Sequence, residues 1–192
     1  MLQLATLINH HAAFRPDELA LVFEDERLNW RDFAARVDRC ACLLHWLGVR
    51  RGDRVATVLG NCRELLDIYW AVPAIGAVLV PLSPLLLASG LASLVRDAGA
   101  ACVITQRSLA PMLEEVRGEL PQLRADRILL VDGASGDFPD YRALLGSCPA
   151  GGHSPVPVAQ DELFNIMYTS GTTGLPKGIM HSHFVRAMYC TL

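Results

Sequence analysis

The segment 163–182, LFNIMYTSGTTGLPKGIMHS, constrains the fold of this chain more than any other part of its sequence. It begins with an apolar run, residues 163–168, that is long enough for one buried strand. A polar stretch with two glycines comes next, followed by Lys177 and a second short apolar run, residues 178–180. This order predicts a strand, a loop and a second strand, and then a helix that Ser182 can cap.

The polar loop between the two predicted strands has the composition of a phosphate-binding loop. Gly171 and Gly174 permit positive φ angles, so successive backbone N–H groups can turn toward one anion. Hydroxyl groups and the ammonium group of the lysine would add further donors. Residues 170–174 are predicted to form the cradle, with Thr172 and Thr173 as the best hydroxyl candidates. The candidate nucleotide-binding residues are Thr169, Ser170, Gly171, Thr172, Thr173, Gly174 and Lys177.

Two widely used phosphate motifs do not match this loop. The Walker pattern ends in Gly-Lys-Ser/Thr, whereas here Pro176 precedes Lys177 and Gly178 follows it. The dinucleotide-binding pattern G-x-G-x-x-G is absent from the sequence as well. An ordinary hairpin loop, in which Lys177 is a surface cation, is the alternative interpretation of the same residues.

Residues 168–178, YTSGTTGLPKG, resemble the phosphate-binding loop of the adenylate-forming superfamily. That superfamily comprises acyl- and aryl-CoA synthetases, adenylation domains of nonribosomal peptide synthetases, and luciferases. Each of four earlier segments is an ordinary packing or turn pattern by itself, but their order resembles the amino-terminal third of an acyl-CoA synthetase. One departure is the leucine run at residues 85–87, which is less polar than the helix entry common in the family. The four segments are residues 16–30, 47–61, 76–84 and 97–105.

The resemblance implies an ATP-dependent acid–CoA ligase of the kind that serves fatty acid metabolism. In such enzymes a carboxylate attacks the α-phosphate of Mg-ATP, giving an acyl-adenylate and pyrophosphate, and the thiol of coenzyme A then displaces AMP. The loop would hold the β- and γ-phosphates, so the implied cofactors are ATP, magnesium and coenzyme A, and the implied partner is a small carboxylic acid. His183 fits a family position, but no catalytic residue and no metal ligand is assigned within the chain. A peptide-synthetase adenylation domain, another adenylate-forming enzyme, and a non-catalytic nucleotide-binding module are the alternatives.

Composition excludes some classes of partner. The chain is 52% hydrophobic with a formal net charge of −3, which gives no electrostatic case for binding nucleic acid or an anionic membrane. Its six cysteines contain no C-x-x-C pair and no zinc spacing, and they are read as reduced thiols of a cytoplasmic protein. The amino terminus lacks the basic and apolar regions of a signal peptide.

The longest uncharged stretch, residues 68–95, is long enough to suggest a membrane helix. Three prolines interrupt it, and each would break such a helix. A helix end, a buried strand over residues 77–80, a turn over residues 81–84 and a second helix fit the pattern better. We therefore expect no integral membrane span.

Helical and strand patterns alternate along the chain, which predicts an α/β fold with a largely parallel sheet flanked by helices. The resemblance identifies this sheet with the amino-terminal part of the large domain of an acyl-CoA synthetase-like fold. Asn29 is predicted to cap the helix that Gly48 ends, and Gly99 is predicted to end another. Helices are expected at residues 4–14, 30–47, 62–74, 86–98 (or 89–98), 108–120 and 138–145, and strands at 19–23, 27–29, 54–59, 77–80, 101–105 and 128–131.

The predicted domain organisation has three parts: an amino-terminal α/β subdomain at residues 1–147, a Pro/Gly linker at 148–160, and the start of a second subdomain at 161–192. The phosphate-binding loop, residues 169–177, belongs to the third part. The helix that starts at His183 reaches the last residue without a stop signal. We therefore expect a fragment of a longer enzyme, inactive as a ligase alone, whose uncovered apolar surface permits self-association.

Overall fold

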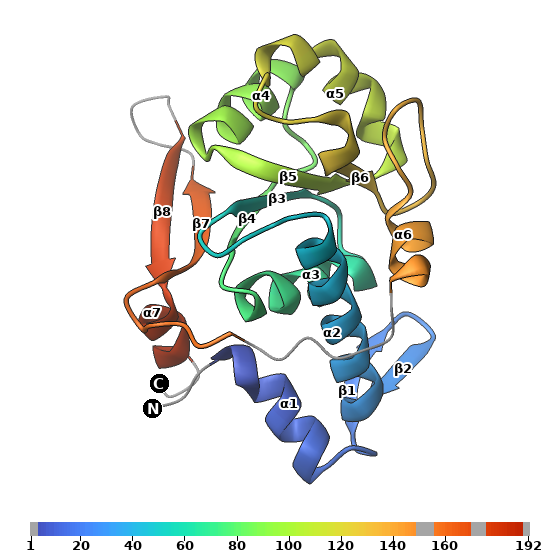
Figure 1. Ribbon diagram of the computed structural model, residues 1–192, viewed down its shortest axis with the longest axis vertical. Coiled ribbons are helices and arrows are strands. Elements are labelled where there is room, and N and C mark those ends of the chain that lie inside the picture. The colour runs from blue at the N-terminus through green and yellow to red at the C-terminus, as the bar shows by residue number, and fades with distance from the viewer. Residues whose placement is uncertain (1–3, 149–155, 170–175, 190–192) are drawn as a thin grey trace.

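The structure, a computed structural model, describes residues 4–148, 156–169 and 176–189. These residues form an α/β fold around a six-stranded sheet with the strand order β6-β5-β3-β4-β7-β8 (Figure 1). Neighbouring strands run parallel from β6 to β7, and β8 is antiparallel to β7. The predicted fold class is confirmed. The strands are β3 (Arg54–Val58), β4 (Val78–Leu82), β5 (Ala100–Thr105), β6 (Ile128–Leu130), β7 (Leu163–Thr169) and β8 (Lys177–Ser182).

Helices cover both faces of this sheet, and Figure 1 shows the two layers on opposite sides of it. Helices α2 and α3 pack with α6 on one face, while α4 and α5 pack on the other. A separate two-stranded hairpin, β1 (Leu19–Phe23) with β2 (Glu26–Asn29), connects α1 to α2. The helices are α1 (Leu4–Phe14), α2 (Trp30–Trp46), α3 (Arg63–Ala74), α4 (Ala88–Asp97), α5 (Ala110–Glu115), α6 (Tyr141–Ser147) and α7 (His183–Met188).

The central strands are apolar on both faces, as strands of a covered parallel sheet must be. In β3, Val55 faces the core under α2 and α3, whereas Ala56 and Val58 face the core under α4 and α5. All three side chains are at most 1% exposed. The sheet is therefore a rigid platform on which the segments at its strand ends are carried.

Several local signals in the sequence act as predicted. The Asn29 side chain caps α2, because its Oδ1 accepts a hydrogen bond from the Asp32 amide at 2.8 Å. Gly48 and Gly99 follow α2 and α4 with φ angles of +83° and +58°, which favour glycine. Ser182 caps α7 by accepting a hydrogen bond from the Val185 amide at 3.3 Å.

The prediction of one helix over residues 108–120 is wrong. The segment is divided into a 3₁₀ turn (Arg107–Leu109), α5 and a second 3₁₀ turn (Arg117–Glu119). Pro111 lies in the first turn of α5, where its missing N–H costs nothing. The β-branched Val116 and the glycine at 118 are weak helix formers, so the α-helix ends before them.

The uncharged segment 68–95 contributes to α3, β4 and α4. The prediction of a turn at residues 81–84 is partly wrong, because Pro81 lies inside β4 and pairs with Thr57 of β3. Pro81 is the last residue but one of its strand, and its missing N–H removes one hydrogen-bond donor from β4 there. Among the described residues, no helix has both the length and the apolar character needed to cross a membrane.

Strands β7 and β8 extend the same sheet that β3 to β6 form. They follow the segment 148–160, of which residues 149–155 lie outside the described part of the chain. The division into parts at 1–147, 148–160 and 161–192 stays a prediction.

Ion pairs with two buried carboxylates attach α3 to its neighbouring helices. Asp67 of α3 is 1% exposed and accepts hydrogen bonds from the guanidinium of Arg36 on α2, with an Nε–Oδ1 distance of 3.2 Å. Glu64, one turn earlier, is 4% exposed and accepts a hydrogen bond from Arg142 of α6 at 2.9 Å. Burial raises the pKa of Asp67 to about 6, although Arg36 acts in the opposite direction.

This raised pKa predicts a pH-dependent stability. Between pH values near 4 and 6 the folded protein holds a proton on Asp67 that the unfolded chain has lost, so stability should fall as pH rises through this window. The free energy of unfolding, measured by urea denaturation, should fall relative to that of Asp67→Asn by up to about 1.4 kcal/mol per pH unit. The exposed Asp137→Asn serves as the control. A pH-independent difference between the wild type and Asp67→Asn would contradict this.

Candidate functional site

Strands β7 and β8 bring the two ends of the predicted phosphate loop together. Their antiparallel register runs from Leu163 opposite Ser182 to Thr169 opposite Lys177. The two predicted strands are therefore paired as a hairpin, and the side chains of Thr169 and Lys177 are exposed at its loop-bearing end. The other candidate residues lie outside the described part of the chain: Ser170, Gly171, Thr172, Thr173 and Gly174.

The loop-bearing end of this hairpin lies at the edge of the sheet where the parallel strands have their carboxyl ends. The chain leaves β3 toward α3 on one face and leaves β4 toward α4 on the other. Such a change of direction opens a crevice beyond the strand ends, which is where α/β proteins generally bind ligands. Because β7 runs parallel beside β4, its last residue, Thr169, lies toward the same edge.

One face of the hairpin is held by α7. Asn165 of β7 is fully buried, and its Oδ1 accepts a hydrogen bond from Arg186 Nε at 2.8 Å. A second nitrogen of Arg186 lies 3.2 Å from the sulfur of Met167. Arg186 therefore attaches α7 to two positions of β7. This contact was not predicted from the sequence, although Asn165 is the one polar residue inside an apolar run.

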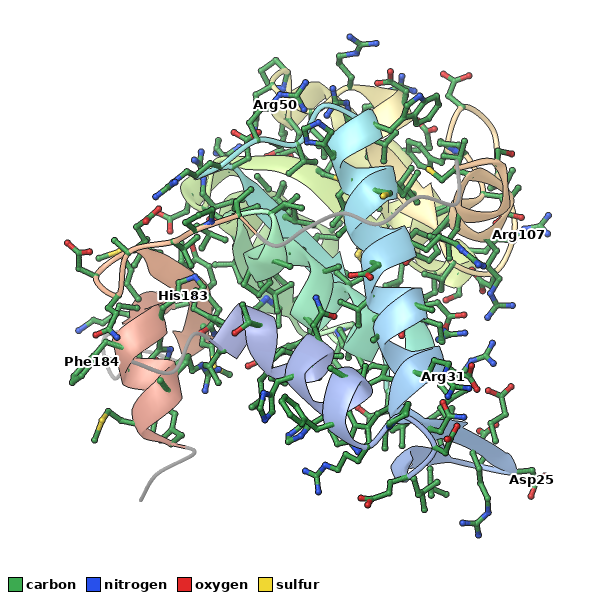
Figure 2. All side chains as sticks on the ribbon, turned by 60° about the horizontal axis from the view of Figure 1, so that its bottom comes forward. Asp25, Arg31, Arg50, Arg107, His183 and Phe184 are labelled. Carbon is green, nitrogen blue, oxygen red and sulfur yellow. The ribbon has the colours of Figure 1, made fainter. Side chains whose placement is uncertain are left out.

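His183, the first residue of α7, is 5% exposed and stands edge-on to the ring of Phe164, with 5.2 Å between ring centroids. Burial lowers its pKa, which favours the neutral imidazole. Neither of its ring nitrogens has a hydrogen-bond partner among the described residues. Figure 2 shows His183 turned inward while Phe184, 43% exposed, points outward. This geometry gives His183 no proton-transfer partner within the described residues.

The opposite face of the hairpin is directed toward α4. Tyr168 and Ile166 pack against the core that α4 and α5 cover. The Tyr168 hydroxyl donates a hydrogen bond to the carboxylate of Asp97, the last residue of α4. Burial raises the pKa of Tyr168, so its phenol keeps the donated proton.

A cavity of about 200 Å³ opens between this face and the end of β4. Its lining is mainly apolar and reaches both ends of the predicted loop. The lining residues are Pro81, Leu82, Ser83, Leu86, Leu94, Tyr168, Thr169 and Pro176.

The described residues contain no group of three or more His, Cys, Asp or Glu side chains that could hold a metal ion. What the structure brings together at the end of the hairpin is one ammonium group, one threonine hydroxyl and the two ends of a glycine-containing loop. This set of donors suits an anion.

Comparison with known proteins agrees with the sequence resemblance. Residues 8–192 match the family model described as AMP-binding enzyme. The long-chain-fatty-acid–CoA ligase FadD13 of Mycobacterium tuberculosis is 34% identical over 161 residues, which are 83% of this chain and 30% of that protein. A crotonobetaine/carnitine–CoA ligase of Escherichia coli is 31% identical over 162 residues, or 82% of this chain and 31% of that protein.

Solved structures share the fold. A fatty acyl CoA synthetase of Mycobacterium tuberculosis superimposes with a TM-score of 0.76 at 28% identity, covering 94% of this chain and 34% of that one. The anthranilate CoA ligase AuaEII, in complex with anthranoyl-AMP, gives a TM-score of 0.87 at 24% identity, covering 95% of this chain and 35% of that one. The chain thus spans about a third of the length of these proteins, and it belongs to the AMP-binding enzyme family.

Proposed function

We propose that this chain carries the phosphate-binding part of an ATP-dependent acid–CoA ligase. In the first step a carboxylate oxygen attacks the α-phosphorus of ATP, the bond to the β-phosphate oxygen breaks, and acyl-adenylate and pyrophosphate result. In the second step the sulfur of coenzyme A attacks the acyl carbon, and AMP leaves. Family membership and the names of the relatives support this proposal. The observation that carries it is the pairing of Thr169 with Lys177 at the carboxyl edge of the sheet.

Lys177 is assigned to the β- and γ-phosphates of ATP. It is the only lysine of the sequence, whose other sixteen Lys or Arg positions are arginines. Its side chain is exposed and makes no salt bridge with the residues that the structure describes, so its charge is available to an anion. A compact ammonium group is a suitable phosphate ligand.

The loop residues 170–174 are proposed to complete the phosphate cradle with backbone N–H groups and hydroxyls. Departing pyrophosphate gains negative charge, so donors already aimed at it stabilise the transition state more than the bound substrate. Magnesium, when bound, would neutralise part of the phosphate charge. No residue is assigned to magnesium, to coenzyme A or to the acid.

The remaining parts of the proposal concern the protein as a whole. Its relatives are about three times as long as the matched segment, so we assign ligase activity to a polypeptide of that length and none to this chain alone. The cytoplasm, which supplies ATP and coenzyme A, is the proposed location. Exposed apolar side chains on β8 and α7, among them Met180 and Phe184, make self-association of the isolated chain an expected property.

The single lysine makes phosphate binding directly measurable on this chain. Reductive methylation with carbon-13 formaldehyde keeps the positive charge and labels only Lys177 and the α-amino group. Titration with pyrophosphate should shift the Lys177 methyl signal saturably, more strongly than orthophosphate does, and the effect should weaken with added salt. The α-amino signal is the internal control, and equal shifts of both signals would mean unspecific ion binding.

The corresponding substitution has a defined expected size. Lys177→Ala should weaken pyrophosphate binding about tenfold or more in calorimetric titration, because a charge-assisted contact contributes about 1.5–3 kcal/mol. Arg124→Ala, which removes an exposed cation of the same charge from a distant loop, should leave the affinity unchanged. Equal affinities of the wild type and Lys177→Ala would return Lys177 to the role of a surface cation.

A further inference from the structure

The loop-bearing end of the β7–β8 hairpin has little support from the backbone of the sheet. In the described part of the chain, β8 is the edge strand and pairs with β7. The ladder between β4 and β7 is formed at Leu79 and Asn165, ahead of residues 166–169. Beyond the pairing of β7 with β8, side-chain contacts attach the last residues before the loop to the rest of the molecule.

On one face of the hairpin, that contact is the hydrogen bond from the Tyr168 hydroxyl to Asp97. Tyr168 directly precedes Thr169, the first candidate residue of the loop, and Asp97 is the last residue of α4. A carboxylate at a helix C-terminus faces the negative end of the helix dipole, so Asp97 does not serve the stability of α4. Asp97 instead accepts the hydrogen bond from the Tyr168 hydroxyl.

Gly178 of β8 has no side chain and so leaves space for the ring of Tyr168. It lies opposite Tyr168 in the register, and the tyrosine ring extends across it. A Cβ at position 178 would lie 3.3 Å from two ring atoms of Tyr168 and 3.0 Å from Cγ2 of Ile166. Both distances are tighter than ordinary van der Waals contact, so a side chain at this position would require Ile166 and the Tyr168 ring to shift by a few tenths of an ångström.

We propose that the hydrogen bond between Tyr168 and Asp97 positions the phosphate loop, and that Gly178 leaves the space in which the Tyr168 ring lies. The hydrogen bond fixes the backbone at Thr169 and, through the register, at Lys177. Arg186 holds the other face of β7 at Asn165 and Met167, so the hairpin is attached on both faces. The inference rests on the proposed phosphate-binding function of the loop and adds two positioning residues to it.

The physical effect of such a contact is preorganisation of the loop ends. A loop whose ends are already fixed loses less conformational freedom when it closes around an anion, so it binds more tightly with unchanged donors. Removing the hydrogen bond should then increase the motion of the loop ends and weaken anion binding while all the donors remain.

The test compares Tyr168→Phe, Asp97→Ala and the double variant in the methylated chain. Each single change should weaken pyrophosphate binding about three- to tenfold, the value of one hydrogen bond. The double variant should lose no more than either single variant, because both remove the same contact. Asp97→Asn, whose amide oxygen can still accept from the tyrosine, should retain most of the affinity. Asp137→Ala, which removes an exposed carboxylate paired with Arg117, is the matched control.

A second measurement does not depend on ligand. Backbone relaxation of the Thr169 and Lys177 amides should show increased motion in Tyr168→Phe and Asp97→Ala, with the amides of β3 unchanged. If the wild type binds no pyrophosphate but these amides become mobile, the proposed function fails and the positioning contact stands. Unchanged relaxation together with wild-type affinity, or additive losses in the double variant, would overturn the inference. A loss of affinity that appears only in variants with a proportionally lower unfolding free energy would overturn it as well.

Discussion

The antiparallel pairing of β7 with β8 is the interaction on which the candidate site depends. It places Thr169 beside Lys177 and directs both toward the edge where the parallel strands end. The pairing is possible because β7 first joins β4 at Asn165, inside a sheet whose strands are apolar on both faces. The sheet thus carries a hairpin whose loop-bearing end, at Thr169 and Lys177, lies beyond the pairing of β7 with β4.

The hairpin combines two kinds of contact with different energetic characters. Toward α4 and α5, Ile166 and Tyr168 pack against the apolar core, and the Tyr168 hydroxyl adds a hydrogen bond to Asp97. The attachment of the hairpin to α7 is polar, through the buried amide of Asn165 and the guanidinium of Arg186. A buried amide without such a partner costs about 1–3 kcal/mol, so Arg186 and Asn165 depend on each other.

The sequence was most informative where a signal is local. The loop between residues 169 and 177 could be predicted from consecutive residues, and the caps Asn29 and Ser182 bond to amides three positions along the chain. The apolar strand runs sufficed for the α/β class, because parallel strands covered on both faces leave no polar side. The failed prediction at residues 108–120 arose where helix periodicity continued across weak helix formers.

What the sequence could not supply are contacts between distant positions. Asp97 and Tyr168 are separated by 71 positions, and no periodic pattern connects them. The hydrogen bond between Arg186 and Asn165 depends on the turn from β8 back into α7, which brings the two residues together. Residues 170–174 stay a sequence-based prediction, because they lie outside the described residues.

The most direct test of the account identifies the nucleotide product. A polypeptide that contains this chain and extends over the full length of its relatives should be incubated with ATP, magnesium, coenzyme A and a panel of carboxylic acids. The account predicts that AMP and pyrophosphate form in equal amounts, that their formation requires an acid, and that Lys177→Ala lowers the rate more than it weakens binding of the acid. Formation of ADP and orthophosphate, or AMP release that is independent of any acid, would contradict it.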